Sequence, residues 1–141
     1  MPNNTNNKSR RIKGRFIALP HFVINDPKFL ELSPGAVKLL IDIAEQFNLK
    51  NNGDLCAAFS IMRRRGWKSK DTLNRKLREL IDAGFIQQTR QGGLNNGPNL
   101  YAITWKPIDE CLDKRGNHKL DVSPTKEPSN LWRVMKISEA A

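Results

Sequence analysis

Apolar residues recur every three or four positions in two segments of the chain, which is the spacing of one buried helix face. The first segment predicts a helix over about residues 34–48, with Ser33 as its N-cap and Pro34 at a position where a missing N–H costs nothing. The second predicts a helix over residues 69–83 that stops at Gly84. Each predicted helix therefore has one apolar face and a capped end.

Shorter elements are predicted around these helices. The opening stretch FIALPHFVIND contains Pro20 and favours a short strand or turn over a long helix. After a turn at 51–53, residues 54–56 are expected to pair as a short strand. A further helix is expected over 57–65, ended by Gly66 in a left-handed conformation. Only about three residues then precede the next helix, which is the tight joint of a helix-turn-helix.

The segment after these helices alternates as strands do. Residues 85–90 and 100–105 predict two strands joined by the flexible stretch GGLNNGPN, which makes a β-hairpin with a long tip. The expected fold is therefore α+β, with three helices and a hairpin in one domain over residues 16–105.

The charge of the chain indicates which kind of partner this fold binds. The 141 residues include 24 lysines and arginines against 14 acids, which gives a formal charge of +10 and a pI near 10.0. This balance favours a polyanionic partner, either nucleic acid or an anionic membrane surface. Residues 16–60 hold five acids and three lysines, whereas residues 61–78 hold eight basic residues and one acid. The positive charge is thus concentrated on the predicted helix-turn-helix.

The apolar stripe of the helix over 69–83 leaves a mainly cationic face outward, and such a helix brings its N-terminal residues to base edges in the major groove. Arg75 could donate two hydrogen bonds to a guanine, and Thr72 could touch a thymine methyl or a phosphate. Arg63–Arg65 are expected to contact phosphates, and the hairpin tip to lie along a minor groove or the backbone. The candidate DNA-binding residues are Arg64, Arg65, Lys68, Ser69, Lys70, Thr72, Arg75, Lys76, Arg90, Asn95 and Asn96.

Two extensions flank the predicted domain. Residues 1–15 are basic and almost free of apolar side chains, so we expect a flexible arm that reaches an adjacent minor groove. Residues 106–141 form a polar tail whose order the pattern leaves open. Its apolar side chains either anchor a protein partner or a dimer, or fold back on the core. These side chains are Trp132, Val134, Met135 and Ile137.

Over residues 16–105 the sequence resembles the winged helix-turn-helix superfamily, through the runs WKSKDTLNRKLRELIDAGFI and GPNLYAITW. LSPGAVKLLIDIAEQFN followed by NNGDL is similar to the N-terminal DNA-binding domains of plasmid and phage replication proteins, and to small accessory proteins of mobile elements. The resemblance implies a regulator or replication accessory factor that binds double-stranded DNA. Because the chain ends soon after the predicted wing, we do not expect it to act as an initiator on its own.

Other classes of function find less support in the residues. His21 and His118 lie in different segments without a catalytic motif, and Cys56 and Cys111 lack the spacing of a zinc site, so no enzyme, metal or cofactor is expected. No apolar run could span a membrane, which favours a cytoplasmic protein. A protein-interaction module built on the winged fold and the tail is the main alternative. Binding to single strands would need stacking aromatics, for which only Trp67 is a candidate, and this side chain is expected to pack at the turn.

Overall fold

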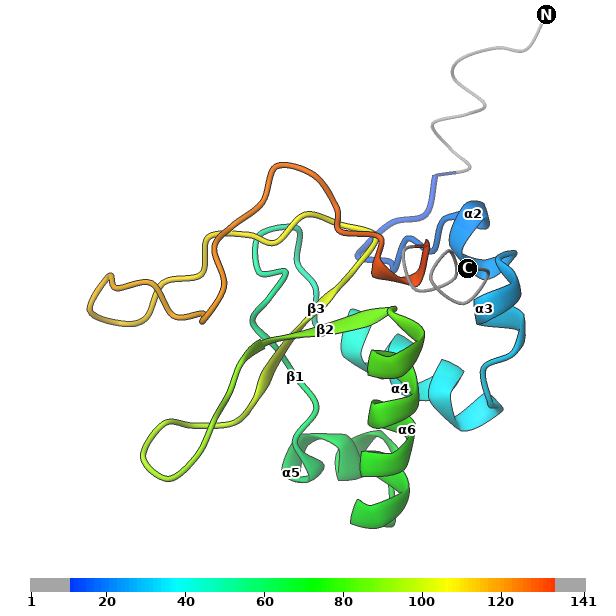
Figure 1. The fold of residues 1–141 in the computed structure, drawn as a ribbon, viewed down its shortest axis with the longest axis horizontal. Coiled ribbons are helices and arrows are strands. Elements are labelled where there is room, and N and C mark those ends of the chain that lie inside the picture. The colour runs from blue at the N-terminus through cyan, green and yellow to red at the C-terminus, as the bar shows by residue number, and fades with distance from the viewer. Residues whose placement is uncertain (1–10, 134–141) are drawn as a thin grey trace, which may run out of the picture.

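The computed structural model describes residues 11–133 and has an α+β fold (Figure 1). A small antiparallel sheet lies beside a group of helices. In chain order the elements are α2 (His21–Ile24), α3 (Pro27–Leu30), α4 (Pro34–Ala44), β1 (Leu55–Cys56), α5 (Phe59–Met62), the 3₁₀ helix η1 (Arg63–Arg65), α6 (Lys70–Ala83), β2 (Ile86–Arg90) and β3 (Leu100–Ile103). The predicted mixture of helices and a hairpin is therefore confirmed.

The sheet has three strands in the order β1-β3-β2. The predicted hairpin is formed by β2 and β3, with Ile86 opposite Ile103 and an irregularity between Gln88 and Arg90. On the other side of β3, Leu55 of β1 lies opposite Tyr101. The expected short strand after the turn at 51–53 thus completes the sheet, and β3 is its buried central strand.

Helix α6 begins and ends as the sequence predicts. The Ser69 side chain accepts a hydrogen bond from the backbone N–H of Thr72, and Gly84 ends the helix with φ of 86°. The helix predicted over 57–65 is instead a short α-helix, α5, that continues as η1 and ends at Gly66 with φ of 98°. A tighter 3₁₀ turn at a helix end is common because it pairs carbonyls that an α-helix leaves free.

Helix α4 is shorter than the predicted 34–48, because side chains from elsewhere pair with the backbone beyond Ala44. The Asn51 amide donates to the carbonyl oxygen of Gln46 at 2.9 Å. Arg15 Nη2 donates to the carbonyl oxygens of Glu45 and Phe47 at 3.2 and 3.3 Å. These donors satisfy carbonyls at the helix end and let the chain turn toward β1.

The strand or turn expected around Pro20 is two short helices instead, so the expectation of a strand was wrong. Asp26 caps α3, since its side chain accepts a hydrogen bond from the N–H of Lys28, and Pro27 occupies the first helical position. A capping aspartate followed by proline starts a helix in the same way as Ser33 and Pro34 do for α4.

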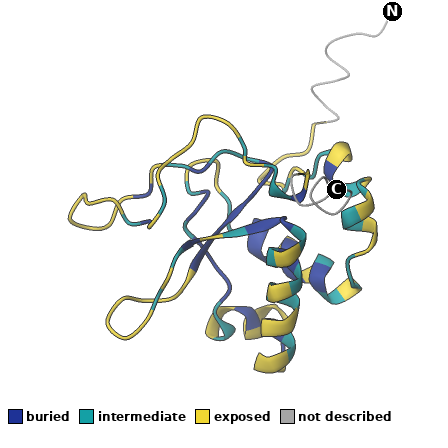
Figure 2. Ribbon diagram, viewed as in Figure 1, coloured by how far each residue is buried: buried dark blue, intermediate teal, exposed yellow. Residues whose placement is uncertain are grey.

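The main core lies between the helices and one face of the sheet, as the dark blue segments of Figure 2 show. It contains Leu39 and Leu40 of α4, Leu73 and Leu80 of α6, and Phe85 just before β2. Each of these side chains is almost fully buried. The apolar stripe predicted for residues 69–83 therefore packs into the core, whereas α4 buries Leu39, Leu40 and Ile43 and leaves Ile41, expected on its buried face, exposed.

The segment after β3 belongs to the fold as far as it is described. Trp132 is 1% exposed and stacks on Phe85 with ring centroids 6.0 Å apart. Ile108 and Leu120 pack in a second cluster with Leu100. This cluster lies on the sheet face opposite the main core, because neighbouring residues of a strand face opposite ways. Of the alternatives for Trp132, packing on the chain's own core is thus the one observed; Val134, Met135 and Ile137 lie outside the described residues.

An amide joins this segment to the sheet. The buried Asn52 donates through Nδ2 to the carbonyl oxygens of Ile103, Lys106 and Pro107 at 2.8–3.1 Å. Its Oδ1 accepts from the N–H of Ile103 at 2.9 Å. One side chain therefore satisfies the backbone where β3 ends and the chain turns back. Among residues 11–133, no helix has the length and apolar character needed to cross a membrane.

Candidate nucleic-acid interface

A buried carboxylate holds the joint between η1 and α6. Asp42 of α4 is 4% exposed and accepts hydrogen bonds from Lys38 Nζ at 2.7 Å, from Arg65 Nε at 3.0 Å and from Trp67 Nε1 at 2.8 Å. Lys38 Nζ also donates to the carbonyl oxygen of Arg65 at 2.6 Å. Trp67 is buried, as expected for packing at the turn. The joint is therefore tied to α4 through one residue.

The electrostatics of this network follow from its donors. Burial alone would raise the pKa of Asp42, but the hydrogen bonds from Lys38, Trp67 and Arg65 outweigh it, so the pKa lies below its ordinary value of 3.8. Asp42 is therefore ionised at neutral pH. The negative charge of Asp42 is buried on the α4 side of the joint. The basic residues occupy the exposed side of the joint.

A second contact positions α6 against α4. Glu79 of α6 accepts hydrogen bonds from the Ser33 N–H at 2.7 Å and from its hydroxyl at 2.8 Å, while that hydroxyl also caps α4 at Ala36. Burial would raise the pKa of Glu79, but the two bonds from Ser33 and the nearby Lys76 lower it below the ordinary value. The start of α4 and the middle of α6 are thereby fixed to each other.

The outer face of α6 presents Lys70, Asn74, Arg75 and Arg78, all exposed. Arg75 donates to Asp71 Oδ2 at 3.2 Å and to Thr72 Oγ1 at 3.3 Å. The Arg75 and Asp71 side chains are 65% and 83% exposed, and an exposed ion pair of this kind is worth only about 0.2–1 kcal/mol. Arg75 can therefore leave this pair for a ligand at little cost.

A groove runs between the start of α6, the segment around α5 and the hairpin, with a volume of about 610 Å³. Two basic side chains line it, Arg63 and Lys70, and neither has an ion pair within the described part of the chain. Its neutral polar residues are Ser60, Asn74, Asn99 and Tyr101, and no acidic residue lines it. The groove thus combines positive charge with hydrogen-bonding groups.

The hairpin tip stands beside this groove and is internally braced. Arg90 donates to the Asn96 side chain at 2.8 Å, and the Gly92 N–H donates to Asn99 Oδ1 at 2.7 Å. A Cβ at Gly92 would lie 2.2 Å from the carbonyl oxygen of Gly97, so the two sides of the tip approach as only glycine permits. Figure 1 shows the tip, α5 and the start of α6 along one edge of the molecule.

The predicted site residues divide into three groups. Lys68, Ser69 and Lys70 are exposed at the start of α6, with Arg64 nearby on η1. Others turn toward α4: Arg65 reaches Asp42, and Lys76 packs on Gly35 and approaches Glu79 at 3.8 Å. The remaining residues are Thr72 and Arg75 on α6 and Arg90, Asn95 and Asn96 in the hairpin. The structure thus gathers Arg64, Lys68, Ser69, Lys70 and the hairpin residues along one edge, whereas Arg65 and Lys76 turn toward α4 and Arg75 lines a separate depression with Glu31 and Glu79.

Sequence reasoning missed the uncharged members of the groove. Asn74 follows Lys70 by four residues, so the helical period alone could have placed it on the same face. Ser60 and Asn99 gave no such signal, because they meet α6 only through the tertiary fold. Asp42 was counted only as part of a mildly acidic half, whereas it organises the joint.

Within residues 11–133 no group of histidine, cysteine and acidic side chains is arranged to hold a metal ion. Both cysteines are buried and unpaired, and burial raises the pKa of Cys111 to about 11. No protein-family model, curated protein or solved structure shows significant similarity to this chain. The function is therefore argued from the geometry of the chain's own residues.

Proposed function

We propose that this protein binds double-stranded DNA as a winged helix-turn-helix protein, with α6 in the major groove and the β2–β3 hairpin as the wing. The observation that carries this proposal is the acid-free groove between α6 and the hairpin, lined by Arg63, Lys70 and neutral hydrogen-bonding side chains. Cations neutralise phosphates, and amides and hydroxyls recognise base edges.

The arrangement of elements supports this assignment. Helices α4, α5–η1 and α6 precede a hairpin whose strands continue into a three-stranded sheet with β1. A joint held by Asp42 keeps α6 at a fixed angle to the preceding helices, which recognition of a rigid duplex requires. The short helices α2 and α3 and the segment 106–133 are additions that lie outside this arrangement.

Roles follow from position on α6. Lys70, at the first turn, adds its charge to the positive end of the helix dipole and suits a phosphate. Asn74, one turn later, has the donor and acceptor that pair with adenine, and Arg75 has the fork that pairs with guanine. Arg64 and Lys68, beside the joint, suit the flanking backbone.

The alternative, a protein-interaction module, depended on apolar side chains of the C-terminal segment. Trp132 is buried against Phe85 and Phe22, so it offers no anchor to a partner in this arrangement. The basic edge remains unexplained by that alternative. We therefore favour DNA, and the resemblance to replication and mobile-element proteins makes a regulator or replication accessory factor the role we propose.

Fluorescence anisotropy with random duplex DNA and the matching single strand tests this function. We expect duplex preference, and a loss of affinity on Lys70→Ala that reduces the slope of log K against log salt by about 0.9, the value for one phosphate contact. Lys114→Ala, an exposed lysine on the 106–133 segment, is the matched control and should change neither quantity. Equal binding of single strands, or equal effects of the two variants, would contradict the proposal.

A further inference from the structure

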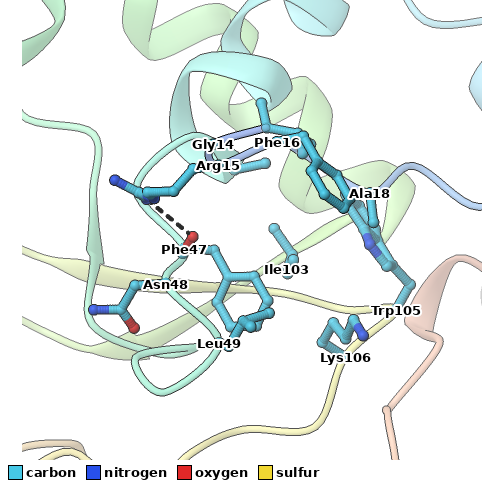
Figure 3. Close-up of a pocket in the computed structure, with 12 residues that line it drawn as sticks. Gly14, Arg15, Phe16, Ala18, Phe47, Asn48, Leu49, Ile103, Trp105 and Lys106 are labelled. Carbon is cyan, nitrogen blue, oxygen red and sulfur yellow. Dashed lines mark hydrogen bonds between the residues drawn. The ribbon is translucent and has the colours of Figure 1, made fainter. Parts of the chain in front are cut away.

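An apolar cavity of about 400 Å³ lies on another part of the molecule from the groove. Figure 3 shows it between the segment Gly14–Ala18 on one side and the Phe47–Leu49 turn on the other, with Trp105 and Lys106 at a third side. Ile103 of β3 belongs to its wall. Its volume is within the range of small-molecule sites in proteins, about 300–1,000 Å³.

Two large apolar side chains in the cavity wall are exposed to solvent. Phe16 is 70% exposed and Leu49 is 77% exposed, although the main core lies directly behind them. Leu49 also adopts φ of 77°, a left-handed conformation that leucine rarely takes. An exposed apolar wall held partly by a strained backbone is typical of a surface shaped for a ligand.

The charged side chains at this cavity are both positive. Arg15 and Lys106 line it, and no acidic residue does. The Arg15 guanidinium is held there by its bonds to the carbonyl oxygens of Glu45 and Phe47, and its charge has no acidic partner among the described residues. Lys106 likewise has no ion pair within residues 11–133. Figure 3 shows Arg15 and Lys106 on different sides of the cavity, so an anion beside Lys106 would meet one cation and no acidic side chain.

The same cavity wall contains an orphaned hydrogen-bond donor. Trp105 is 4% exposed, and its Nε1–H has no hydrogen-bond partner among the described residues. A buried indole N–H without an acceptor costs about 1–3 kcal/mol, so such groups are nearly always paired in native proteins. This nitrogen is sealed from solvent, so a molecule in the cavity would contact the Trp105 ring rather than its N–H.

We infer that this cavity binds a small aromatic carboxylate with one or two fused rings. The rings would contact Phe16, Phe47 and Leu49, while the carboxylate would lie near Lys106. Apolar contact beside a lysine without an acidic partner fits an aromatic acid better than a neutral apolar molecule, which would leave the Lys106 charge unpaired. The inference does not depend on DNA binding.

Titration of the whole protein with 1-naphthoate, followed by ¹H–¹⁵N NMR, tests this site. We expect saturable binding in which the indole N–H resonance of Trp105 shifts, that resonance being assigned by its loss in Trp105→Phe. Phe16→Ser should weaken binding about tenfold or more by removing ring contact. Lys106→Gln should weaken it about fivefold, which is the effect of one partly exposed ion pair.

Matched controls distinguish binding in the cavity from nonspecific binding to other exposed side chains. Leu94→Ser removes another exposed apolar side chain, 95% exposed at the hairpin tip, and Lys114→Gln removes another exposed lysine; neither should alter the affinity. Uncharged 1-naphthylmethanol should bind at least about fivefold more weakly than 1-naphthoate. Absence of saturable binding at millimolar 1-naphthoate would overturn the inference, as would equal binding of the neutral analogue.

A second copy of the chain on the same apolar wall is the competing occupant. Sedimentation of the wild-type protein and of Phe16→Ser distinguishes it. A monomer in both cases supports a ligand site. A wild-type dimer that Phe16→Ser converts to a monomer, with no 1-naphthoate bound, would overturn the inference in favour of self-association.

Discussion

At the scale of single residues, the joint before α6 depends on one carboxylate. Asp42 accepts from an ammonium, a guanidinium and an indole, and these three donors come from α4, η1 and the turn that follows. Without the negative charge, two cations and a buried N–H would face one another unpaired. Asp42 thus sets the geometry of the joint although it cannot itself contact DNA.

We predict that Asp42→Asn destabilises the protein by about 2 kcal/mol at pH 7, the cost of losing hydrogen bonds to a charged acceptor. Since the folded pKa lies below the ordinary 3.8, the ionised carboxylate contributes stability that is fully present above that value and is lost as the pH falls through the lowered pKa. Urea unfolding of both proteins should therefore show a smaller difference at pH 3 than at pH 7. An unchanged difference would contradict this role of Asp42.

A second residue-scale constraint lies at the end of α6. Gly84 has φ of 86°, and a Cβ there would lie 2.5 Å from the backbone nitrogen of Trp132. Gly116 has φ of 82°, but a Cβ added there would meet no atom within 4 Å. A substitution at Gly116 therefore strains the backbone in the same way without adding a steric contact. The two glycines therefore separate conformational strain from close packing.

Gly84→Ala should cost about 3 kcal/mol and Gly116→Ala about 1 kcal/mol, because only the former adds a steric clash to the left-handed penalty. Thermal or urea unfolding measures both. Equal costs would mean that Trp132 does not pack against Gly84 in solution.

Whether the role of a residue could be predicted depended on how far along the chain its partners lie. Ser69 and Gly84 act within a few positions of themselves, so their roles as helix boundaries were predicted correctly. Asp42 also pairs with Lys38 four residues away, but its other partners and those of the Asn52 side chain lie 23 to 55 positions away, and no local pattern reports such pairing. Functional positions followed the same rule: the predicted Lys70 lies in the groove, whereas Asn99, which reaches it through the fold, was missed.

At the scale of elements, the long amphipathic helices and the hairpin were predictable, and the short elements were not. Helix α6 has a regular apolar stripe that the core requires. Helix α4 ends early because Asn51 and Arg15 pair with carbonyl oxygens just beyond Ala44, and α2 and α3 are each too short to show a period. Packing and capping, rather than pattern, decide elements of four residues.

The hairpin is the element whose role the proposal makes most specific. Arg90→Ala removes a cation and its bond to Asn96 while leaving the glycine contacts of the tip in place. We predict about fivefold weaker duplex binding in anisotropy, with stability lowered by no more than about 1 kcal/mol. Arg115→Ala, an exposed arginine of the 106–133 segment, should leave duplex affinity unchanged. Similar effects of both changes would remove the hairpin from the interface.

At the scale of the whole molecule, the 106–133 segment enlarges the fold beyond the predicted domain. The segment is polar overall, but a few of its apolar side chains cover the second face of the sheet, and Trp132 packs in the main core. Folding back of Trp132 was one of the two alternatives that the sequence left open, but the second cluster was not predicted, because its anchors Ile108, Cys111 and Leu120 are too widely spaced to form a periodic pattern. The segment therefore contributes to stability on the side of the sheet away from the main core.

Trp132→Ala should destabilise the protein by about 3–5 kcal/mol, the cost of a large cavity in a core. Leu112→Ala, at a side chain that is 54% exposed on the same segment, should change stability by less than about 0.5 kcal/mol. Chemical unfolding of both variants measures the difference. A small effect of Trp132→Ala would show that this segment does not hold the core together in solution.

The central claim is that one edge of the molecule, formed by η1, the start of α6 and the hairpin tip, contacts duplex DNA. Titration of the ¹⁵N-labelled protein with a duplex, followed by amide chemical shifts, tests this claim most directly. We predict that the largest shifts fall within residues 63–75 and 90–99, while the 106–133 segment stays unchanged. Shifts concentrated in the 106–133 segment, or none at low salt, would overturn the proposed interface.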